Sequence, residues 1–184
     1  VGCAVMDRAL IERALLRRML RLRPFRAEDE EPARAAHEAM KADAFPFLLD
    51  YVPNEPWGIY LERREANTRG EQLPPRFVPS TFLAATFDGT LVGRISIRHE
   101  LNNWLATYGG HIGYAVIPAM RRRGYATEIL RQGLVIAHAL GIDDVLVTCD
   151  VNNRASAGVI EGCGGVFESI ASGDGTPKRR YWFR

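Results

Sequence analysis

Residues 113–130 read GYAVIPAMRRRGYATEIL, and this stretch decides the fold because it joins a strand to a helix through a basic turn. The strand pattern ends near Pro118, and the helix pattern begins near Gly124 and Tyr125. A helix start exposes unpaired backbone N–H groups and the positive end of its dipole, and Gly124 and Ala126 leave room for a ligand. The turn is therefore expected to bind phosphate.

Three arginines, Arg121, Arg122 and Arg123, add positive charge to this turn. Because a guanidinium donates hydrogen bonds in a planar fork, it suits phosphate oxygens, and we expect a di- or triphosphorylated cofactor. The plain alternative is a solvated basic loop ahead of an ordinary helix. The turn matches neither the Walker A run nor the three-glycine dinucleotide pattern.

Helix and strand patterns alternate on the downstream side of this turn. We predict helices over residues 125–140 and 153–162, and strands over 144–150, 166–170 and 180–183. The last two strands are expected to be joined by a turn, because the intervening residues include Gly173, Asp174, Gly175 and Pro177.

The upstream half adds four predicted strands and two predicted helices. The strands cover residues 20–24, 81–87, 91–99 and 111–118, and the helices cover 27–40 and 57–67. Between the second and third strands, Asp88 and Gly89 indicate a tight hairpin. This order of elements predicts a mixed α/β sheet of the α+β kind, and excludes a helical bundle or a β-sandwich.

Residues 1–19 are expected to be an amphipathic helical extension ahead of one domain over residues 20–184. Met6, Leu10 and Ala14 share one face of the extension, and arginines lie opposite. A helix of this kind packs on its own domain or on a second subunit more often than on a membrane. A homodimer is therefore left open.

Composition restricts the partners and the compartment. The 184 residues include 24 basic and 22 acidic side chains, a net charge of +2 that argues against nucleic acid binding, although 121–123 and 178–180 are local basic runs. No uncharged run is long enough to cross a membrane. Cys3, Cys149 and Cys163 match neither a zinc site nor a disulfide framework, so we expect a cytoplasmic protein without a structural metal.

The run Val116-x-Pro118-x-x-Arg121-x-x-Gly124-x-Ala126 resembles the acyl-CoA pyrophosphate motif of the GNAT acyltransferase superfamily. Further similar features are Asn153-x-x-Ser156 at the next helix start and the Gly-Gly-Val-Phe run at residues 164–167. The closing run at residues 179–182 resembles uncharacterised members, the predicted acetyltransferases. The resemblance covers residues 20–183 in element order, and its detail is concentrated between residues 113 and 167.

The resemblance implies one GNAT-like domain, with a mostly antiparallel sheet of six to seven strands and helices on both faces. It implies acetyl-CoA as cofactor. Backbone groups around Ala115 and Val116 would hold the pantetheine arm, and Asn153 and Ser156 would approach the pantetheine or the thioester; a helix cap is an alternative, compatible role for Asn153. The pyrophosphate would be held by the remaining cofactor residues, namely Arg121, Arg122, Arg123, Gly124, Tyr125 and Ala126.

Acyl transfer to an amine requires a group that takes the amine proton. The candidates for base or relay are His111, Glu100 and His99, and each of them also fits a purely structural role. Many GNAT enzymes place a tyrosine at the position of Ile160 to protonate the leaving thiolate, so this chain departs from the family there. No nucleophile is assigned, because Cys149 lies in an apolar strand.

The acceptor is expected to enter beside residues 45–60, where aromatic side chains lie near Asp43, Asp50 and Glu55. Most of these aromatic residues are expected to be core. The loop over residues 101–110 is a further candidate for the same cleft. The sequence thus predicts an acetyl-CoA-dependent N-acetyltransferase that uses a small-molecule or peptide amine. The alternative is an acyl-CoA-binding regulatory module with weak or no catalysis.

Overall fold

The described part of the chain, residues 8–71, 73–173 and 175–184 of a computed structural model, forms a sheet of seven strands in the order β1-β2-β3-β4-β5-β7-β6. The strands are β1 (Leu20–Pro24), β2 (Ser80–Phe87), β3 (Thr90–Arg98), β4 (Ile112–Val116), β5 (Val145–Asp150), β6 (Val166–Gly173) and β7 (Gly175–Phe183). The predicted α/β fold with a mostly antiparallel sheet is confirmed.

The junction between β4 and β5 is the exception, because these two strands run parallel. Their ladder, among the described residues, consists of the pair Ile112 and Val147. Beyond this pair the strands separate toward Val116 and Asp150, the carboxyl ends of the two strands. The sheet is therefore open in its middle, on the side that faces the basic turn.

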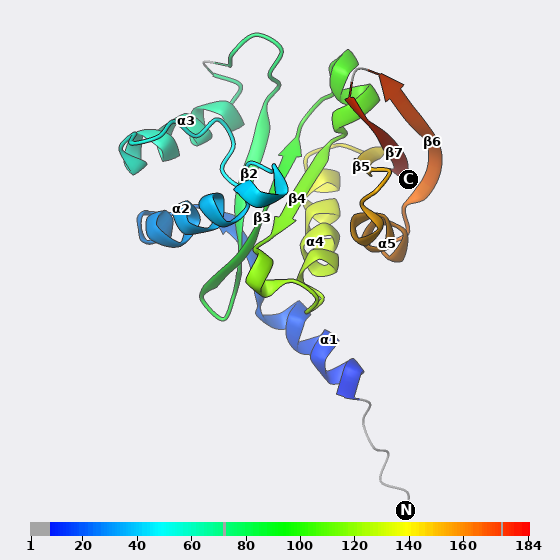
Figure 1. The fold of residues 1–184 in the computed structure, drawn as a ribbon, viewed down its shortest axis with the longest axis horizontal. Helices are drawn as coiled ribbons and strands as arrows, with labels where there is room; N and C mark the ends of the chain where they lie inside the picture. The colour runs from blue at the N-terminus through cyan, green and yellow to red at the C-terminus, as the bar shows by residue number, and fades with distance from the viewer. Residues whose placement is uncertain (1–7, 72, 174) are drawn as a thin grey trace, which may run out of the picture.

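Helices cover both faces of the sheet, as Figure 1 shows. α2 (Glu30–Ala39) and α3 (Trp57–Thr68) lie on one face, and α4 (Tyr125–Ala139) and α5 (Arg154–Gly162) lie on the other. Since side chains alternate along a strand, Ile112 and Val116 of β4 join the core under α4, whereas Ala115 joins the core under α2 and α3. One strand thus contributes to both cores.

The hairpin between β2 and β3 agrees with its sequence signal. Asp88 and Gly89 both have positive φ, at 49° and 75°, as a two-residue turn of the primed type requires. A register shift between Ala85 and Thr86 interrupts the ladder near this turn. The predicted hairpin is confirmed.

The first predicted helix is divided in two. Residues 27–40 form a short η1 turn (Ala27–Asp29) followed by α2, because the Asp29 carboxylate accepts from the Arg26 amide at 2.7 Å and from the Arg23 guanidinium at 2.6 Å. These bonds hold Asp29, which is 4% exposed, at the junction. A second short turn, η2 (Lys41–Asp43), follows α2.

Two predicted loops contain regular structure. The predicted turn between the last strands is shorter than expected, because β6 continues to Gly173 and β7 begins at Gly175. Pro177 is tolerated inside β7, because a register shift between Ala171 and Gly173 interrupts the ladder where proline has no N–H to donate. The predicted loop over residues 101–110 contains a π-helical turn, η3 (Leu105–Gly109). Asp174 lies outside the described residues.

The N-terminal helix α1 (Arg8–Met19) projects from the domain beside the start of α4 (Figure 1). Leu16 packs on the α4 side of the core, whereas Ile11 and Leu15 are 37% and 47% exposed. The part of the predicted extension that includes Met6 lies outside the described residues. The division between extension and domain stays a prediction.

Candidate active site

A cavity of about 720 Å³ occupies the opening between β4 and β5. It is bounded by the end of β4, the turn before α4, the end of β5 and the start of α5, with Met40, Asp43 and Phe45 closing it from the α2 side. All but one of the expected cofactor residues line it: Ala115, Val116, Arg121, Arg122, Gly124, Tyr125, Ala126, Asn153 and Ser156. The fold thus brings together residues that lie up to 41 positions apart between Ala115 and Ser156.

The backbone amide groups at the start of α4 lie at this cavity and have no side-chain cap. After the short turn η4 (Pro118–Met120), Gly124 is the cap residue at φ 81°, and no side chain caps the helix. The first-turn residues Tyr125, Ala126 and Thr127 line the cavity. A helix start without a cap leaves amide hydrogens for an anionic ligand.

Gly124 is needed for its backbone conformation and for packing. A Cβ atom built at this residue would lie 3.0 Å from Cδ1 of Leu16 in α1. From the sequence we expect a glycine here because a phosphate needs room, but the added Cβ atom would contact α1. A positive φ, rather than ligand contact, is the structural requirement for glycine here.

The three arginines of the turn differ in their surroundings. Arg121 donates to the Asp43 carboxylate at 2.5 Å and to the Val116 carbonyl at 3.2 Å, and its side chain is 43% exposed. Arg122 is exposed, and its side chain has no polar partner among the described residues. Arg123 lies outside the cavity lining and donates to the Met120 sulfur at 3.9 Å. Arg121 and Arg122 are thus the two guanidinium groups at the cavity.

The start of α5 contributes Asn153 and Ser156. The Asn153 side-chain oxygen caps the helix by accepting from the Ser156 amide at 3.0 Å. The Ser156 hydroxyl lies 2.9 Å from the Tyr114 hydroxyl of β4, and all three residues line the cavity. Ile160 is fully buried in the core, so it supplies no polar group to the cavity.

The end of β5 places a thiol and a carboxylate on opposite faces of the sheet. Cys149 is buried in the core under α4, and burial raises the pKa of its thiol, although a hydrogen bond with Ser156 acts in the opposite direction. Asp150 lines the cavity and accepts a hydrogen bond from Lys178. A neutral thiol is a poor nucleophile, whereas a carboxylate is able to accept a proton.

The three expected proton acceptors lie outside this cavity. The ladder between β3 and β4 pairs Ile97 with Ile112, so His99, Glu100 and His111 lie at the end of β4 opposite to Val116. His111 Nδ1 accepts from the Leu146 amide at 2.9 Å, and burial together with Arg98 lowers the pKa of its imidazole.

His99 and Glu100 likewise lie away from the cavity. The His99 Nε2 atom is 2.8 Å from the Thr81 hydroxyl, and burial lowers the pKa of its imidazole despite the nearby Glu100 carboxylate. Glu100 is exposed at the strand end. Neither side chain lies among those that line the cavity.

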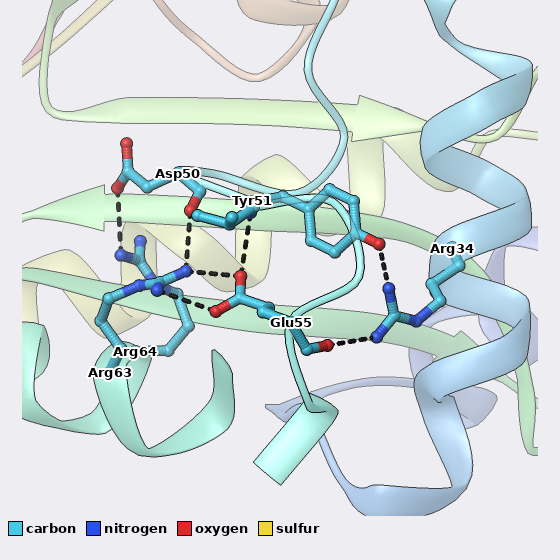
Figure 2. Close-up of polar contacts among 7 residues, drawn as sticks. Arg34, Asp50, Tyr51, Glu55, Arg63 and Arg64 are labelled. Carbon is cyan, nitrogen blue, oxygen red and sulfur yellow. Dashed lines mark hydrogen bonds and ion pairs between the residues drawn. The ribbon is translucent and has the colours of Figure 1, made fainter. Parts of the chain in front are cut away.

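The acceptor-side acids are mostly engaged in a polar network (Figure 2). Arg63 donates to both oxygens of Glu55 at 2.7 and 2.8 Å, and Arg64 donates to Asp50 at 3.0 Å. Arg34 donates to the Glu55 carbonyl at 2.8 Å. Among the three expected acids, Asp43 is the one that lines the cavity.

Most aromatic residues of the same segment are core, as expected. Phe47, Trp57 and Tyr60 are at most 5% exposed, whereas Phe45 lines the cavity. The fully buried Arg94 guanidinium lies over the Phe45 ring and donates to the carbonyls of Pro46 and Phe47 at 3.0 and 3.1 Å. Burial lowers the pKa of Arg94 to about 9, and nearby Arg98 adds to the effect. Arg94 thus anchors the cavity wall that carries Phe45.

The sequence did not single out Tyr114 or Asp150 as site residues. Asp150 carries a recognisable signal, because it is a carboxylate at the end of the apolar strand that runs parallel to the strand of the motif. Tyr114 lies two residues before Val116, so it shares the face of β4 that looks toward α5. Alternation along the strand is the signal that identifies it.

The fold and the cavity define an α/β protein that can hold a long phosphorylated ligand between two diverging strands. A model of the GNAT acetyltransferase domain matches residues 19–166. The chain belongs to the GNAT acetyltransferase family. No curated protein sequence matches it.

Several solved structures have the same fold at low sequence identity. RimJ of Mycobacterium smegmatis, in complex with CoA-disulfide, has a TM-score of 0.65 and 19% identity over 89% of this chain and 81% of its own. An acetyl transferase of Salmonella typhimurium that modifies the N-terminal serine of ribosomal protein L7/L12 has a TM-score of 0.62 and 18% identity over 90% and 94%. The putative acetyltransferase yncA of the same organism, with acetyl-CoA, has a TM-score of 0.60 and 13% identity over 90% and 94%.

The described residues include neither a membrane-spanning helix nor a metal-binding cluster. No described helix combines the length and the apolar character that crossing a bilayer demands. No cluster of three or more His, Cys, Asp or Glu side chains in the described ranges is placed to hold a metal ion.

Proposed function

We propose that this protein is an N-acetyltransferase that transfers the acetyl group of acetyl-CoA to a primary amine by direct attack. The observation that carries the proposal is the uncapped start of α4, which opens with Arg121 and Arg122 into the cavity between β4 and β5. Acetyl-CoA has the matching chemistry, since it joins a diphosphate to a long arm that ends in a thioester. Family membership and the ligands of similar structures support the same cofactor.

The diphosphate would bind at the turn and first helical turn over residues 121–126. The pantetheine arm would follow Ala115 and Val116, because the β4 edge beyond Ile112 has no described ladder partner on the β5 side. The thioester would then lie at the far end of the cavity from the arginines, near Tyr114, Asn153 and Ser156. Arg123 would contribute charge to the turn without lining the cavity.

Direct attack is favoured over an acyl-enzyme. The raised pKa of Cys149 keeps its thiol neutral, and an amine held against the thioester gains rate from positioning. Asp150 is our candidate for receiving the proton of the amine, because its carboxylate lines the cavity. A role for His111, Glu100 or His99 would require a relay, since they lie outside the cavity.

The acceptor would be a small-molecule or peptide amine that enters beside Met40, Asp43 and Phe45. A peptide amino terminus is one specific candidate, since a structurally similar enzyme modifies an N-terminal serine. Asp43, whose carboxylate also accepts from Arg121 at 2.5 Å, adds negative charge for a cationic amine on that side of the cavity.

Thiol release from acetyl-CoA, measured over a panel of small amines and amino-terminal peptides, tests the proposal. We expect acceptor-dependent release of CoA with at least one amine class, and mass spectrometry should find the acetylated amine. Asp150→Asn should lower turnover and leave acetyl-CoA affinity within about twofold, as expected for a proton acceptor.

A second candidate function is an acyl-CoA-binding module without turnover, which the buried Ile160 favours because it offers no proton donor. Saturable acetyl-CoA binding without thiol release for any amine would support this alternative over the enzyme.

A further inference from the structure

The hydroxyl groups of Tyr114 and Ser156 form a hydrogen-bonded pair that joins β4 to α5 at the cavity. Tyr114 Oη lies 2.9 Å from Ser156 Oγ, and both residues line the cavity. The tyrosine shares its strand face with Ile112 and Val116, which pack under α4. The ring is therefore held by the core, while its hydroxyl is at the cavity.

This pair lies at the end of the cavity where the proposed function places the thioester. The arginines of the turn fix the phosphate end, so the reactive end of the arm must extend away from Arg121 and along β4 toward Tyr114. The inference therefore rests on the proposed function.

The reaction at that end creates negative charge on sulfur. The amine nitrogen forms a bond to the carbonyl carbon, the C–S bond breaks, and its electron pair stays on the sulfur. The amine proton passes to Asp150 and on to solvent, and the thiolate takes up one proton from solvent, so the products are the amide and CoA thiol. A hydrogen-bond donor at the sulfur lowers the barrier, because it interacts more strongly with the thiolate than with the thioester.

Other groups near α5 are poor donors for this step. Ile160 is apolar and fully buried. The Cys149 thiol faces the core and is a weak donor. Asn153 is held by its cap bond with the Ser156 amide, and the Ser156 hydroxyl lies against the phenol, so we take the Tyr114 phenol as the donor for the sulfur.

We propose that Tyr114 donates a hydrogen bond to the departing CoA sulfur, and that Ser156 positions it by donating to the phenol oxygen. With Ser156 as donor, the remaining neighbour of the phenol hydrogen is the Ser156 carbonyl at 3.5 Å, a contact at the long limit of a hydrogen bond, so the hydrogen can turn to a stronger acceptor in the cavity. Tyr114 is then a catalytic residue and Ser156 a positioning residue.

The protonation of the phenol agrees with this role. Burial raises the pKa of Tyr114 to about 12, and the hydrogen bond from Ser156 acts in the opposite direction. The phenol therefore keeps its hydrogen throughout the range in which a thiol ionises, near pH 8.5. It supplies a hydrogen bond to the thiolate at every pH at which the enzyme would work.

Calorimetric binding of CoA and of desulfo-CoA, which lacks the thiol, tests the inference between pH 7 and pH 10. Since a donor at the sulfur stabilises the thiolate, the affinity for CoA relative to desulfo-CoA should rise about tenfold with pH in the wild type, as for a charge-assisted hydrogen bond. The rise should vanish in Tyr114→Phe and shrink in Ser156→Ala. Turnover of Tyr114→Phe should fall about 10- to 100-fold with unchanged acetyl-CoA affinity.

Tyr181→Phe is the matched control. Tyr181 is also buried, its hydroxyl bonds Glu161 of α5 at 2.8 Å, and its pKa is likewise raised to about 12 by burial, but it lies outside the cavity lining. This variant should keep the pH-dependent rise and its turnover. If the affinity for CoA relative to desulfo-CoA rises with pH as much in Tyr114→Phe as in Tyr181→Phe, the role of Tyr114 is overturned and the proposed function still stands. Absence of CoA binding by the wild type overturns both.

Discussion

Two arginine-rich regions of this protein use the same side chain in opposite ways. Around the segment that joins α2 to α3, Arg34 of α2 and Arg63 and Arg64 of α3 each donate to a carboxylate or carbonyl of that segment (Figure 2). In the turn before α4, Arg122 has no polar partner among the described residues, and Arg121 has one half-exposed ion pair. The arginines of the first region are paired within the protein, whereas the second region has an unpaired guanidinium group at a cavity.

The comparison shows that an arginine count does not identify a ligand site. Glu55, whose side chain is 8% exposed, is held by two bonds from Arg63 and fixes the wall of the acceptor side. The turn has an uncapped helix start at the same place as its free guanidinium. An unpaired guanidinium together with uncapped amide hydrogens is what distinguishes the proposed ligand-binding region.

The largest expected effect comes from Gly124→Val compared with Gly141→Val at the other end of α4. Both glycines have positive φ, 81° and 84°, so each variant should lose about 1–2 kcal/mol of folding free energy to backbone strain, and Gly124→Val should lose more because its side chain also meets Leu16. Because the positive φ of Gly124 sets the direction of the first amides of α4 at the cavity, a distorted backbone there should weaken acetyl-CoA binding about 100-fold or more, whereas Gly141 lies outside the cavity lining. Urea unfolding and calorimetry measure the two quantities. Equal affinities in both variants would remove the turn from the site.

A smaller effect is expected from Glu55→Gln in the paired region, which should cost about 2 kcal/mol near pH 7 and leave acetyl-CoA affinity unchanged. Burial alone would raise the pKa of Glu55, but hydrogen bonds from Arg63 and the Val52 amide lower it overall. A lowered folded-state pKa means that this stability is complete above the unfolded pKa, about 4.3, and is lost as pH falls through the folded value.

Urea unfolding from about pH 2.5 to about pH 7 measures this pH dependence, because a glutamate carboxyl group titrates within that range. Glu65→Gln, which breaks an exposed pair with Arg69, is the control and should change stability by less than about 0.5 kcal/mol. A pH profile of Glu55→Gln parallel to that of the wild type would contradict the assignment of the acid-sensitive stability to Glu55.

The smallest effect is expected from Arg122→Ala, which should raise the acetyl-CoA dissociation constant about tenfold at low salt. The loss should shrink as salt is added, because added ions screen an exposed guanidinium. Arg69→Ala removes an arginine of similar exposure whose partners are Glu65 and Glu71, so it should leave affinity unchanged. Titrations of both variants with acetyl-CoA at two ionic strengths make the comparison. Equal affinities for the two variants would show that the unpaired Arg122 guanidinium does not contribute to acetyl-CoA binding.

Local patterns in the sequence predicted the fold and the position of the cavity. The hairpin at Asp88 and Gly89, the helix start at Tyr125 and the cap at Asn153 each depend on a few neighbouring residues. Such signals are visible without knowledge of distant contacts. The resemblance to the GNAT superfamily rests on the motif at residues 116–126, and both the family and the mostly antiparallel sheet that it implies are confirmed.

Contacts between distant segments limited the prediction of the catalytic groups. His111 was a candidate base because of its residue type, but its Nδ1 atom bonds the amide of Leu146, 35 residues away. Tyr114 meets Ser156 only because β4 and α5 face one cavity, and their separation of 42 residues hides the pair in the sequence. Chemistry that depends on which strand faces which helix appears only in the assembled fold.

Calorimetric titration of the wild-type protein with acetyl-CoA tests the central claim most directly. If the bare start of α4 and its arginines form the diphosphate site, acetyl-CoA should bind at one site per chain with micromolar affinity, and added salt should weaken the binding. Absence of saturable binding at two temperatures, with the protein folded by circular dichroism, would contradict the account.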